Sequence, residues 1–481
     1  MIAWTLYITF AGAVALRLLP RTWARWLALA TAVAGCGVAA AAFFNPAAQS
    51  GVFQTITDLP WIAALGIRFH LAADGISLTM ALLTGIVAVS AVLFSWDVAE
   101  RQNEFYFWLL LVAGGSYGVF LSADLFLFFV FYELVIVPKY FLIATWGSTN
   151  KAYGAMKLTL YSFFGGALVL VALIAAYLAG GSFDLQSLSH HHFSPQLQAW
   201  AFPVMFLGFA VLGGIWPLHT WAPTGHVAAP TAGSMLLAGV VMKLGAYGAL
   251  RVAMNLFPEG FQMWRGAIAL LAVTGIVYAA AVALRQRDLK FVIGYSSVSH
   301  MGFVLLGLAT ASALGAAGAV LQMFSHGIIA GLLFAVVGRM IYPRTHTRNL
   351  DELSAMDIGR VIPFAAFAFA VASAASIGIP GFSGFVAEIT ILIGAWHAYP
   401  IVVVVTGAGM VLTAAFTLRA LKQTFFGDTK PSHPLKCEPI SVAEKFGASL
   451  LMAATLAAGL YPKPLFDRIL PALEAMRWLK P

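Results

Sequence analysis

Runs of about twenty apolar residues recur along this chain and are separated by short polar segments. A helix of that length crosses about 30 Å of hydrocarbon. Only 10% of the residues are charged, whereas a soluble domain carries about 25%. The alternation over segments of about ten residues that a membrane barrel needs is absent. The sequence therefore predicts an all-α, polytopic membrane protein.

We expect about fourteen transmembrane helices, at 2–19, 25–44, 76–96, 105–122, 125–146, 155–179, 200–221, 228–250, 264–284, 290–310, 314–341, 361–397, 400–425 and 444–462. Met1–Leu19 lacks a basic n-region, so we interpret it as the first span rather than a signal peptide. The longest polar loops, at about 45–75, 180–199, 342–360 and 427–443, are too short to hold a soluble domain. The segment after Leu460 is amphipathic, and we expect it at the membrane surface.

Positive charge predicts the orientation of these helices, because cytoplasmic loops carry an excess of Lys and Arg. With the N-terminus outside, the inside loops hold Arg17, Arg21, Arg25, Arg101, Lys151, Lys157, Arg285, Arg287, Lys290, Arg339, Arg344, Arg348, Arg360, Arg419, Lys422, Lys430, Lys436 and Lys445. The outside segments hold only Arg68, Arg251, Arg265, Lys463, Arg468, Arg477 and Lys480. Both termini are therefore predicted outside, and only Lys139 and Lys243 are left inside spans. Basic residues scattered in this way do not indicate a nucleic-acid partner, despite the net charge of +8.

Two of the predicted spans are interrupted. The first, within Gly208–Arg251, contains Gly213, Gly214, Pro217, His219, Pro223 and Pro230, and the second contains Gly378, Pro380, Gly381 and Gly384. Broken backbone at membrane depth is tolerated where protein or a water-filled cavity surrounds it. Paired breaks at corresponding positions indicate inverted repeats with ion sites at the breaks. We predict a three-helix segment at 1–104, five-helix repeats at 105–251 and 264–425, and a last span with an amphipathic tail at 426–481.

Five ionisable residues within predicted spans are candidates for proton transfer: Glu133, Lys243, His300, His326 and Glu388. Charged groups inside a membrane are costly and by default functional. A buried carboxylate or lysine exchanges protons when burial and neighbouring charges tune its proton affinity, and histidine titrates near neutral pH. The alternatives are structural ion pairs for the charged residues and satisfied core positions for the histidines.

Other polar residues have plainer interpretations. Lys290 is expected to be a topology charge at the headgroups, and Lys139 is expected to snorkel to the interface. His219 lies at the first break and could be a hydrogen-bonding staple or a proton gate. His190–His192 form a solvated outside loop more plausibly than a metal site, and Asp74 is expected to cap the next span.

Redox chemistry is not indicated on this chain. Cys36 and Cys437 form neither a disulfide framework nor a cluster site, and no metal-ligand spacing, nucleotide loop or haem motif is present. Any redox centre is therefore expected on partner subunits.

Several motifs resemble those of a known family, namely FHLAADGISL, FYELVIVPKYFLIATWG, KLTLYSFFGG, PLHTWAPTGHVAAPTAGSMLLAGVVMKLGAYG, DLKFVIGYSSVSHMGFVLLG, MFSHGIIAGLLF and GIPGFSGFVAE. Across nearly the whole chain they resemble the antiporter-like membrane subunits of respiratory complex I, and most closely the subunit M family of NADH-quinone oxidoreductases. The resemblance implies fourteen spans with helices seven and twelve broken, and a proton path through Glu133, Lys243, His300, His326 and Glu388. Lys157 also falls where the family tends to have a lysine.

The resemblance further implies a bacterial inner-membrane subunit that couples electron transfer in its partners to proton transfer. NADH, FMN, Fe–S clusters and quinone would belong to those partners, which include neighbouring antiporter-like subunits and the quinone module. The same motifs occur in subunits of Mrp-type cation/proton antiporters and membrane-bound hydrogenases, so these stay open as alternatives.

One departure from the family bears on Glu133. Its usual partner, a lysine on helix seven, is replaced by Leu212, the proline that follows is Gly214, and the P-D-A-H motif ends here as Thr-Gly-His226. Three explanations are open: Lys139 substitutes, water or another residue suffices, or the subunit has lost pumping and is structural. Six residues along a straight helix would turn Lys139 away from the Glu133 face, which argues against the first.

Overall fold

The computed structural model describes residues 1–45, 51–427 and 437–479, so the loop lysines Lys430 and Lys436 and the terminal Lys480 lie outside the described residues. The N-terminal segment contains α1 (Trp4–Leu16), η1 (Arg21–Trp23), α2 (Ala24–Phe43), β1 (Gln54–Ile62), η3 (Ala63–Leu65), β2 (Ile67–Ala73) and α3 (Gly75–Leu93). The first broken region and the helices before it are α4 (Gln102–Leu121), α5 (Leu125–Leu134), α6 (Ile136–Trp146), α7 (Lys151–Gly180), α8 (Leu185–His190), α9 (Pro195–Gly213), α10 (Trp221–Ala228), α11 (Thr231–Leu236), η4 (Leu237–Val241), α12 (Met242–Gly248), η5 (Ala249–Ala253) and α13 (Met254–Leu256).

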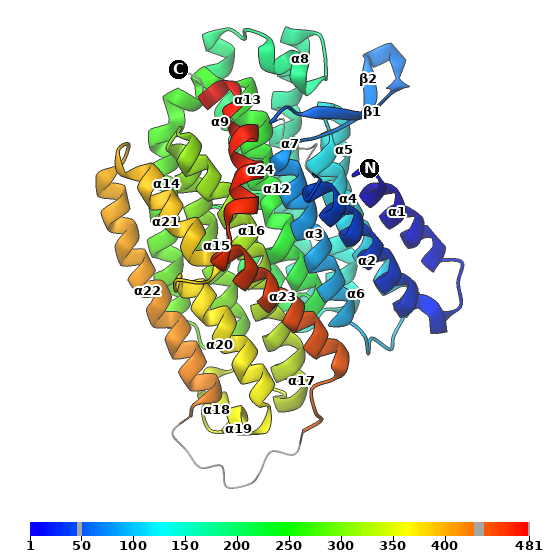
Figure 1. Cartoon of the computed structure of the whole chain (residues 1–481), viewed down its shortest axis with the longest axis vertical. Coiled ribbons are helices and arrows are strands. Elements are labelled where there is room, and N and C mark those ends of the chain that lie inside the picture. The colour runs from blue at the N-terminus through cyan, green and yellow to red at the C-terminus, as the bar shows by residue number, and fades with distance from the viewer. Residues whose placement is uncertain (46–50, 428–436, 480–481) are drawn as a thin grey trace.

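The second half continues with α14 (Pro258–Arg285), α15 (Leu289–Ala309), α16 (Ala313–Ala335), η6 (Val336–Ile341), α17 (Tyr342–Thr345), α18 (Leu350–Leu353), α19 (Ile358–Val361), α20 (Pro363–Ile377), α21 (Ser383–Trp396), α22 (Pro400–Phe425), α23 (Val442–Leu460), α24 (Lys463–Glu474) and η7 (Arg477–Leu479). Most long helices run along the long axis of the molecule (Figure 1).

The predicted membrane fold is confirmed. Within the described residues, eleven helices are long and apolar enough to cross a membrane. The remaining three expected spans correspond to the shorter α1, to the broken pair α20 and α21, and to α23. The predicted repeat boundaries stay a prediction, although both breaks are present.

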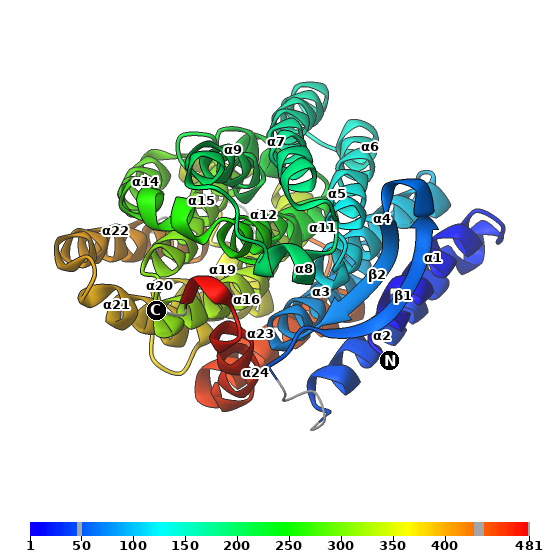
Figure 2. The same ribbon diagram turned by 90° about the horizontal axis from the view of Figure 1, so that it is seen from above.

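Burial separates central helices from peripheral ones. The span Thr231–Leu256 and the span Ala313–Thr345 are enclosed by protein, whereas α7 and α22 expose most of their apolar surface. Seen from above, α12 and α16 lie in the middle of the bundle and α7 and α22 at its edge (Figure 2). The enclosed helices carry Lys243 and His326, so the candidate site lies at the centre of the bundle.

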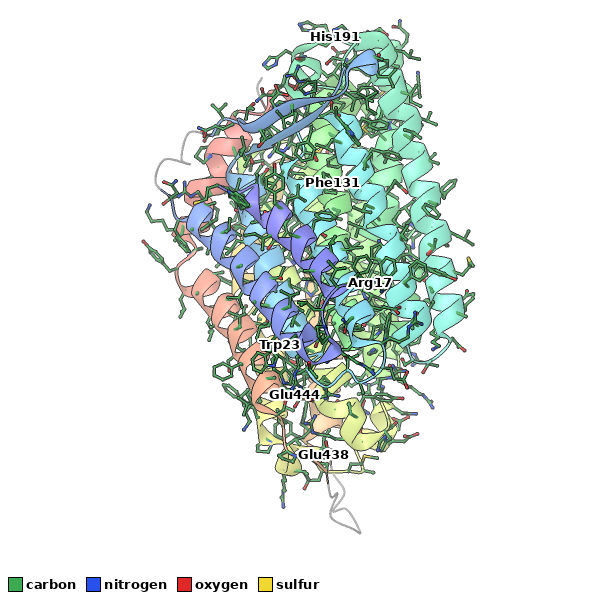
Figure 3. All side chains as sticks on the ribbon, turned by 90° about the vertical axis from the view of Figure 1, so that its right-hand side faces the viewer. Arg17, Trp23, Phe131, His191, Glu438 and Glu444 are labelled. Carbon is green, nitrogen blue, oxygen red and sulfur yellow. The ribbon has the colours of Figure 1, made fainter. Side chains whose placement is uncertain are left out.

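The two ends of the bundle differ in structure. One end, which we call the α8 end, carries α8, the strands β1 and β2 and the C-terminal residues (Figure 1). The other, the α18 end, carries α17, α18 and α19; His191 and Glu438 mark these opposite ends in Figure 3. The chain starts near the α8 end as well, since Tyr7 stacks on Phe69 of β2 with ring centroids 6.5 Å apart. Both termini therefore lie at the same end.

The hairpin of β1 and β2 was not predicted, since the segment 45–75 was expected to be a loop. The two strands pair antiparallel, and His70 of β2 lies 3.0 Å from Asp184, the N-cap of α8. Burial raises the pKa of the Asp184 carboxyl, but hydrogen bonds from His70 and Ser187 outweigh this effect and lower it to about 2. The hairpin is thus fastened to the loop before α8 by a charge-assisted contact.

Both predicted helix breaks are confirmed. α9 ends at Gly213, and Gly214 adopts the left-handed conformation with φ 67°. α20 ends at Ile377, and Gly378 also adopts the left-handed conformation, with φ 80°. Glycine suits these positions because other residues pay a steric cost at positive φ.

The C-terminal tail packs along the bundle rather than lying free on its surface. Arg468 of α24 is buried and donates a hydrogen bond to the carbonyl of Asn45, and its own backbone lies against Gly75 at the start of α3. α23 is held at the α18 end by Glu444, which pairs with Arg344 at 2.9 Å. The tail therefore closes the bundle beside α3 and α16.

Candidate functional site

Lys243 lies fully buried at the centre of the bundle, with 0% of its surface exposed. It sits on the short helix α12 between two π-helical segments, η4 and η5. A π-helix shifts the backbone hydrogen bonds to i→i+5, and such segments are frequent at functional sites. The Lys243 ammonium donates a hydrogen bond to the carbonyl of Ala238, five residues earlier in η4.

A row of buried ionisable side chains starts at Lys243. Its Nζ lies 2.6 Å from Nδ1 of His326 on α16, and the His326 and His300 rings lie 5.4 Å apart between centroids. Nδ1 of His300 on α15 then lies 3.3 Å from Oε1 of Glu388 on α21. Four of the five predicted residues are therefore brought together, from four different helices.

Two further polar residues complete this row, and the sequence interpretation missed both. Gln322 lies with its Nε2 3.2 Å from His300 Nδ1 and 3.5 Å from Glu388 Oε1. Ser376 lies 3.1 Å from His300 Nε2, at the end of α20. A signal existed for Gln322, since it precedes His326 by four residues in an apolar span and such a spacing places both side chains on one helix face.

Glu133 stands apart from this row. Within the described residues no hydrogen bond or ion pair joins it to Lys243, and its Oε1 has no hydrogen-bond partner. Its carboxylate lies against Gly166 of α7, where a Cβ atom would overlap it. The predicted order from Glu133 directly to Lys243 is therefore not seen as a direct contact.

Lys139 does not snorkel, so that prediction was wrong. The side chain is only 2% exposed and lies inside the protein, on α6. The physical reason is a break between α5 and α6: Pro138 offers no N–H to the carbonyl of Leu134, and the helix is interrupted at Val135. The straight-helix argument that separated Lys139 from Glu133 does not apply to a broken helix.

Lys290 is also buried rather than at the headgroups, which corrects its prediction. Its Nζ donates a hydrogen bond to the Ala229 carbonyl at 3.0 Å and faces a hollow of about 230 Å³ at the α18 end. His226 lies within electrostatic reach of both Lys290 and Lys243, and neither of its ring nitrogens has a hydrogen-bond partner in the described chain. Lys290 and Lys243 thus both act electrostatically on His226, and no hydrogen bond joins the three residues within the described chain.

A second hollow, of about 580 Å³, opens at the α8 end. It is lined by Asp74 and Arg251, which form a buried ion pair at 2.6 Å. Arg251 therefore lies buried in η5 and not in a loop as predicted, and its predicted position on the outer side stays a prediction. Asp74 also accepts two backbone hydrogen bonds at 3.0 Å from Ile76 and Ser77, which confirms it as the cap of α3. Tyr247, one turn after Lys243, lies 3.1 Å from Ser77 Oγ.

The remaining accessory residues lie away from the row. Lys157 donates to Thr224 Oγ1 at 3.4 Å, and its charge acts on His219. His219 is buried between Tyr278 and Tyr295, with both ring nitrogens unpartnered within the described residues. The structure therefore places His219 at the first break but joins it to no member of the Lys243 row by a described hydrogen bond.

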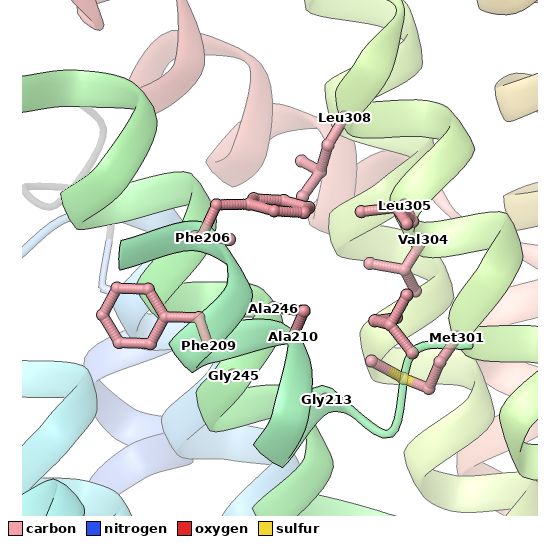
Figure 4. A pocket seen from close by; sticks show the side chains of 12 residues that line it. Phe206, Phe209, Ala210, Gly213, Gly245, Ala246, Met301, Val304, Leu305 and Leu308 are labelled. Atoms are coloured by element: carbon pink, nitrogen blue, oxygen red, sulfur yellow. The ribbon is translucent and has the colours of Figure 1, made fainter. Parts of the chain in front are cut away.

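No group of three or more ligating residues that could hold a metal ion occurs in the described part of the chain. The side chains of His190–His192 diverge: His190 Nδ1 lies 2.8 Å from the Gln186 carbonyl, and His192 Nδ1 lies 2.8 Å from Arg477. The cavity shown in Figure 4, between α9, α12 and α15, is lined by apolar side chains and measures about 10 Å³. That volume holds about one water molecule and excludes a quinone ring.

A bundle of membrane helices with two broken spans and a buried row of lysine, histidines and glutamate defines an ion-translocating membrane subunit. Residues 122–416 match the family described as "NADH:quinone oxidoreductase/Mrp antiporter, TM", and the chain belongs to this family.

The relatives include NAD(P)H-quinone oxidoreductase chain 4 1 of Synechococcus elongatus, which is 37% identical over 91% of this chain and 84% of its own length. NADH-quinone oxidoreductase subunit M of Rhodobacter capsulatus is 36% identical over 94% of this chain and 90% of its own length. Among solved structures, a chain of respiratory complex I from Thermus thermophilus superposes with a TM-score of 0.91 at 26% identity over 100% of both chains. A chain of the Mrp complex from Dietzia superposes with a TM-score of 0.87 at 20% identity over 99% of this chain and 97% of its own, which shows a shared fold.

Proposed function

We propose that this chain is the proton-translocating membrane subunit of a complex I-type NADH:quinone oxidoreductase. The observation that carries this proposal is the buried row of Lys243, His326, His300 and Glu388, in which direct contacts join Lys243 to His326 and His300 to Glu388 and the two imidazole rings lie 5.4 Å apart between centroids. Relatives named as NADH- or NAD(P)H-quinone oxidoreductase chains, at 36–37% identity, support this assignment over an Mrp-type antiporter, whose structure resembles this chain at 20% identity.

Each step of the row transfers one proton and moves one positive charge. Protonated Lys243 gives a proton from Nζ to His326 Nδ1, which lies 2.6 Å away. His326 passes a proton to His300 by way of water, because the ring centroids are 5.4 Å apart and no direct hydrogen bond joins the two rings within the described residues. His300 then passes a proton from Nδ1 to the Glu388 carboxylate. Glu388 then releases its proton toward the outside, and Lys243 is recharged from the α18 end through His226 and Lys290. Lys157 and His219 are accessory groups at the first break.

Electron transfer supplies the driving force from elsewhere in the assembly. NADH, FMN, Fe–S clusters and quinone belong to partner subunits, and the peripheral apolar faces of α7 and α22 meet lipid or neighbouring membrane subunits. A change of charge at one end of the row alters the proton affinity of Lys243 through Coulomb interaction, which is strong in a medium that excludes water.

We further propose that the chain lies in a bacterial inner membrane with both termini on the outer side. The charge distribution of the loops supports this orientation, and the position of both termini at the α8 end supports their lying on one side of the membrane. A periplasm-active phosphatase fused to the C-terminus should be active, and an inactive fusion would reverse the orientation.

Two experiments test the function. Gentle purification of the tagged chain with mass spectrometry should recover flavin, Fe–S and quinone-site subunits; recovery of small multi-span partners alone would assign the chain to the antiporters.

The second experiment measures protons translocated per electron in membrane vesicles. Lys243→Met and Glu388→Gln should each lower this ratio while the complex stays assembled. The exposed Lys445 and Glu474 offer matched controls, and Lys445→Met and Glu474→Gln should leave the ratio unchanged. A wild-type ratio in both site variants would overturn the proposal.

A further inference from the structure

Lys139 is a buried cation without a hydrogen-bond partner in the described chain. It projects into a cavity of about 10 Å³ whose other lining residues are apolar and come from α4, α6, α11 and η4. Such a cavity holds about one water molecule. Because a charge is retained inside a protein only when it is paired or functional, the environment of this lysine requires an explanation.

Glu133 and Lys139 carry opposite charges that act on each other through Coulomb attraction, although no direct hydrogen bond joins them in the described chain. The Glu133 carboxylate also lacks a hydrogen-bond partner at one oxygen, since its Oε1 is buried and unpartnered within the described residues. The break at Val135, which lies between the two residues, removes the straight-helix geometry that would turn them apart.

The surroundings of Glu133 are shaped for a carboxylate. Gly166 of α7 leaves the space that its Oε1 occupies, and Ser162, one turn earlier on α7, has a buried hydroxyl with no partner among the described residues. The Tyr132 hydroxyl is likewise buried and unpartnered there. Buried polar groups without a hydrogen-bond partner are few in native proteins, so this cluster around Glu133 requires an explanation.

Lys139 also faces the segment that holds Lys243. Its cavity is closed by Leu236 and Leu237, and the next residue, Ala238, accepts the hydrogen bond from the Lys243 ammonium. Lys139 therefore stands between Glu133 and the start of the Lys243 row.

We infer that Lys139 and Glu133 form a proton-sharing pair that couples Glu133 to Lys243, with Lys139 as the cation that Glu133 requires. In one state Glu133 is ionised and Lys139 carries the ammonium charge. In the other, one proton has moved from Nζ to the carboxylate by way of a water molecule in the cavity beside Lys139, and both groups are neutral. The inference rests on the proposed function and adds a specific residue to it.

The test removes the amine at residue 139 and introduces one at residue 212. Lys139→Met removes the charge and keeps an unbranched side chain that is one atom shorter. Leu212 on α9 is buried, and Gly208, one turn before it, packs on Gly165, the neighbour of the glycine that faces Glu133. Leu212→Lys in the Lys139→Met background should therefore return an amine to Glu133, whereas Leu212→Met is the matched control without one.

Protons translocated per electron are measured in vesicles of the assembled complex. Lys139→Met should lose translocation to the level of Lys243→Met, the added Leu212→Lys should restore it, and the added Leu212→Met should not. A wild-type ratio in Lys139→Met, with the Lys243→Met ratio lowered, overturns this inference and leaves the proposed function standing. Wild-type ratios in both variants overturn the proposed function itself.

Melting of the purified complex gives a second readout that survives poor assembly of one variant. Lys139→Met and Glu133→Gln should each lower the melting temperature of this subunit, because each leaves an unpaired buried charge. The double variant should melt higher than either single variant. Additive losses overturn the pairing.

Discussion

The Asp74–Arg251 pair offers a sharp test of how charges are held in this bundle. The two side chains are 1% and 5% exposed, and Arg251 Nη2 lies 2.6 Å from Asp74 Oδ2. The other carboxylate oxygen, Oδ1, caps α3. Asp74→Asn therefore preserves the cap and removes only the charge that Arg251 faces.

The expected cost follows from burial. Removing one partner of a buried ion pair costs about 3–5 kcal/mol, because the other charge is left uncompensated. Asp74→Asn and Arg251→Met should each lose about this much, which at roughly 2 °C per kcal/mol lowers the melting temperature by about 6–10 °C. The double variant buries no charge and should lie within about 2 kcal/mol of the wild type.

The assay is size-exclusion chromatography of the fluorescently tagged chain after heating in detergent. Additive losses in the double variant, or single-variant losses below about 1 kcal/mol, would refute the reasoning. The second result would mean that water in the hollow at the α8 end solvates Arg251 as well as Asp74 does. Lys445→Met, at an exposed position, is the control and should not shift the melting temperature.

Three further predictions concern single residues. Asp184→Asn should lower the melting temperature at pH 7 by the equivalent of about 1–2 kcal/mol. The folded pKa of the Asp184 carboxyl, about 2, lies below the unfolded value, so this stabilisation is present above pH 4 and is lost between pH 4 and 2. Melting curves of the variant and the wild type should therefore converge in that range. Gly378→Ala should destabilise the subunit by about 1–2 kcal/mol, because φ of Gly378 is 80° and an added Cβ would lie 3.0 Å from Glu388 Oε2. An unchanged melting temperature of the variant would contradict this prediction. Gln322→Leu should slow proton translocation without loss of assembly, measured by the dye-quench rate in vesicles, and a wild-type rate would remove Gln322 from the row.

Much of the fold was predictable because its causes are local along the chain. The cost of inserting polar backbone into hydrocarbon makes each apolar run a helix, and Gly214 and Gly378 mark the breaks because they alone tolerate positive φ cheaply there. The cap at Asp74 depends on backbone groups two and three residues away. The same locality singled out Lys243 and Glu388, since a charged residue in an apolar run is visible without neighbours.

The pairing of these charges was decided by tertiary structure. Which way Lys139 points depends on the Pro138 break and on the packing of α6 against α11, and Lys290 and Arg251 are buried because other helices cover them. Hydrogen-bond partners such as Gln322 depend on how each helix is rotated about its axis, which packing determines. The sequence by itself determined the helices, their breaks and the presence of buried charge, because insertion costs act residue by residue. Only the assembled bundle decided which charges meet, because contact between side chains on different helices is a property of packing.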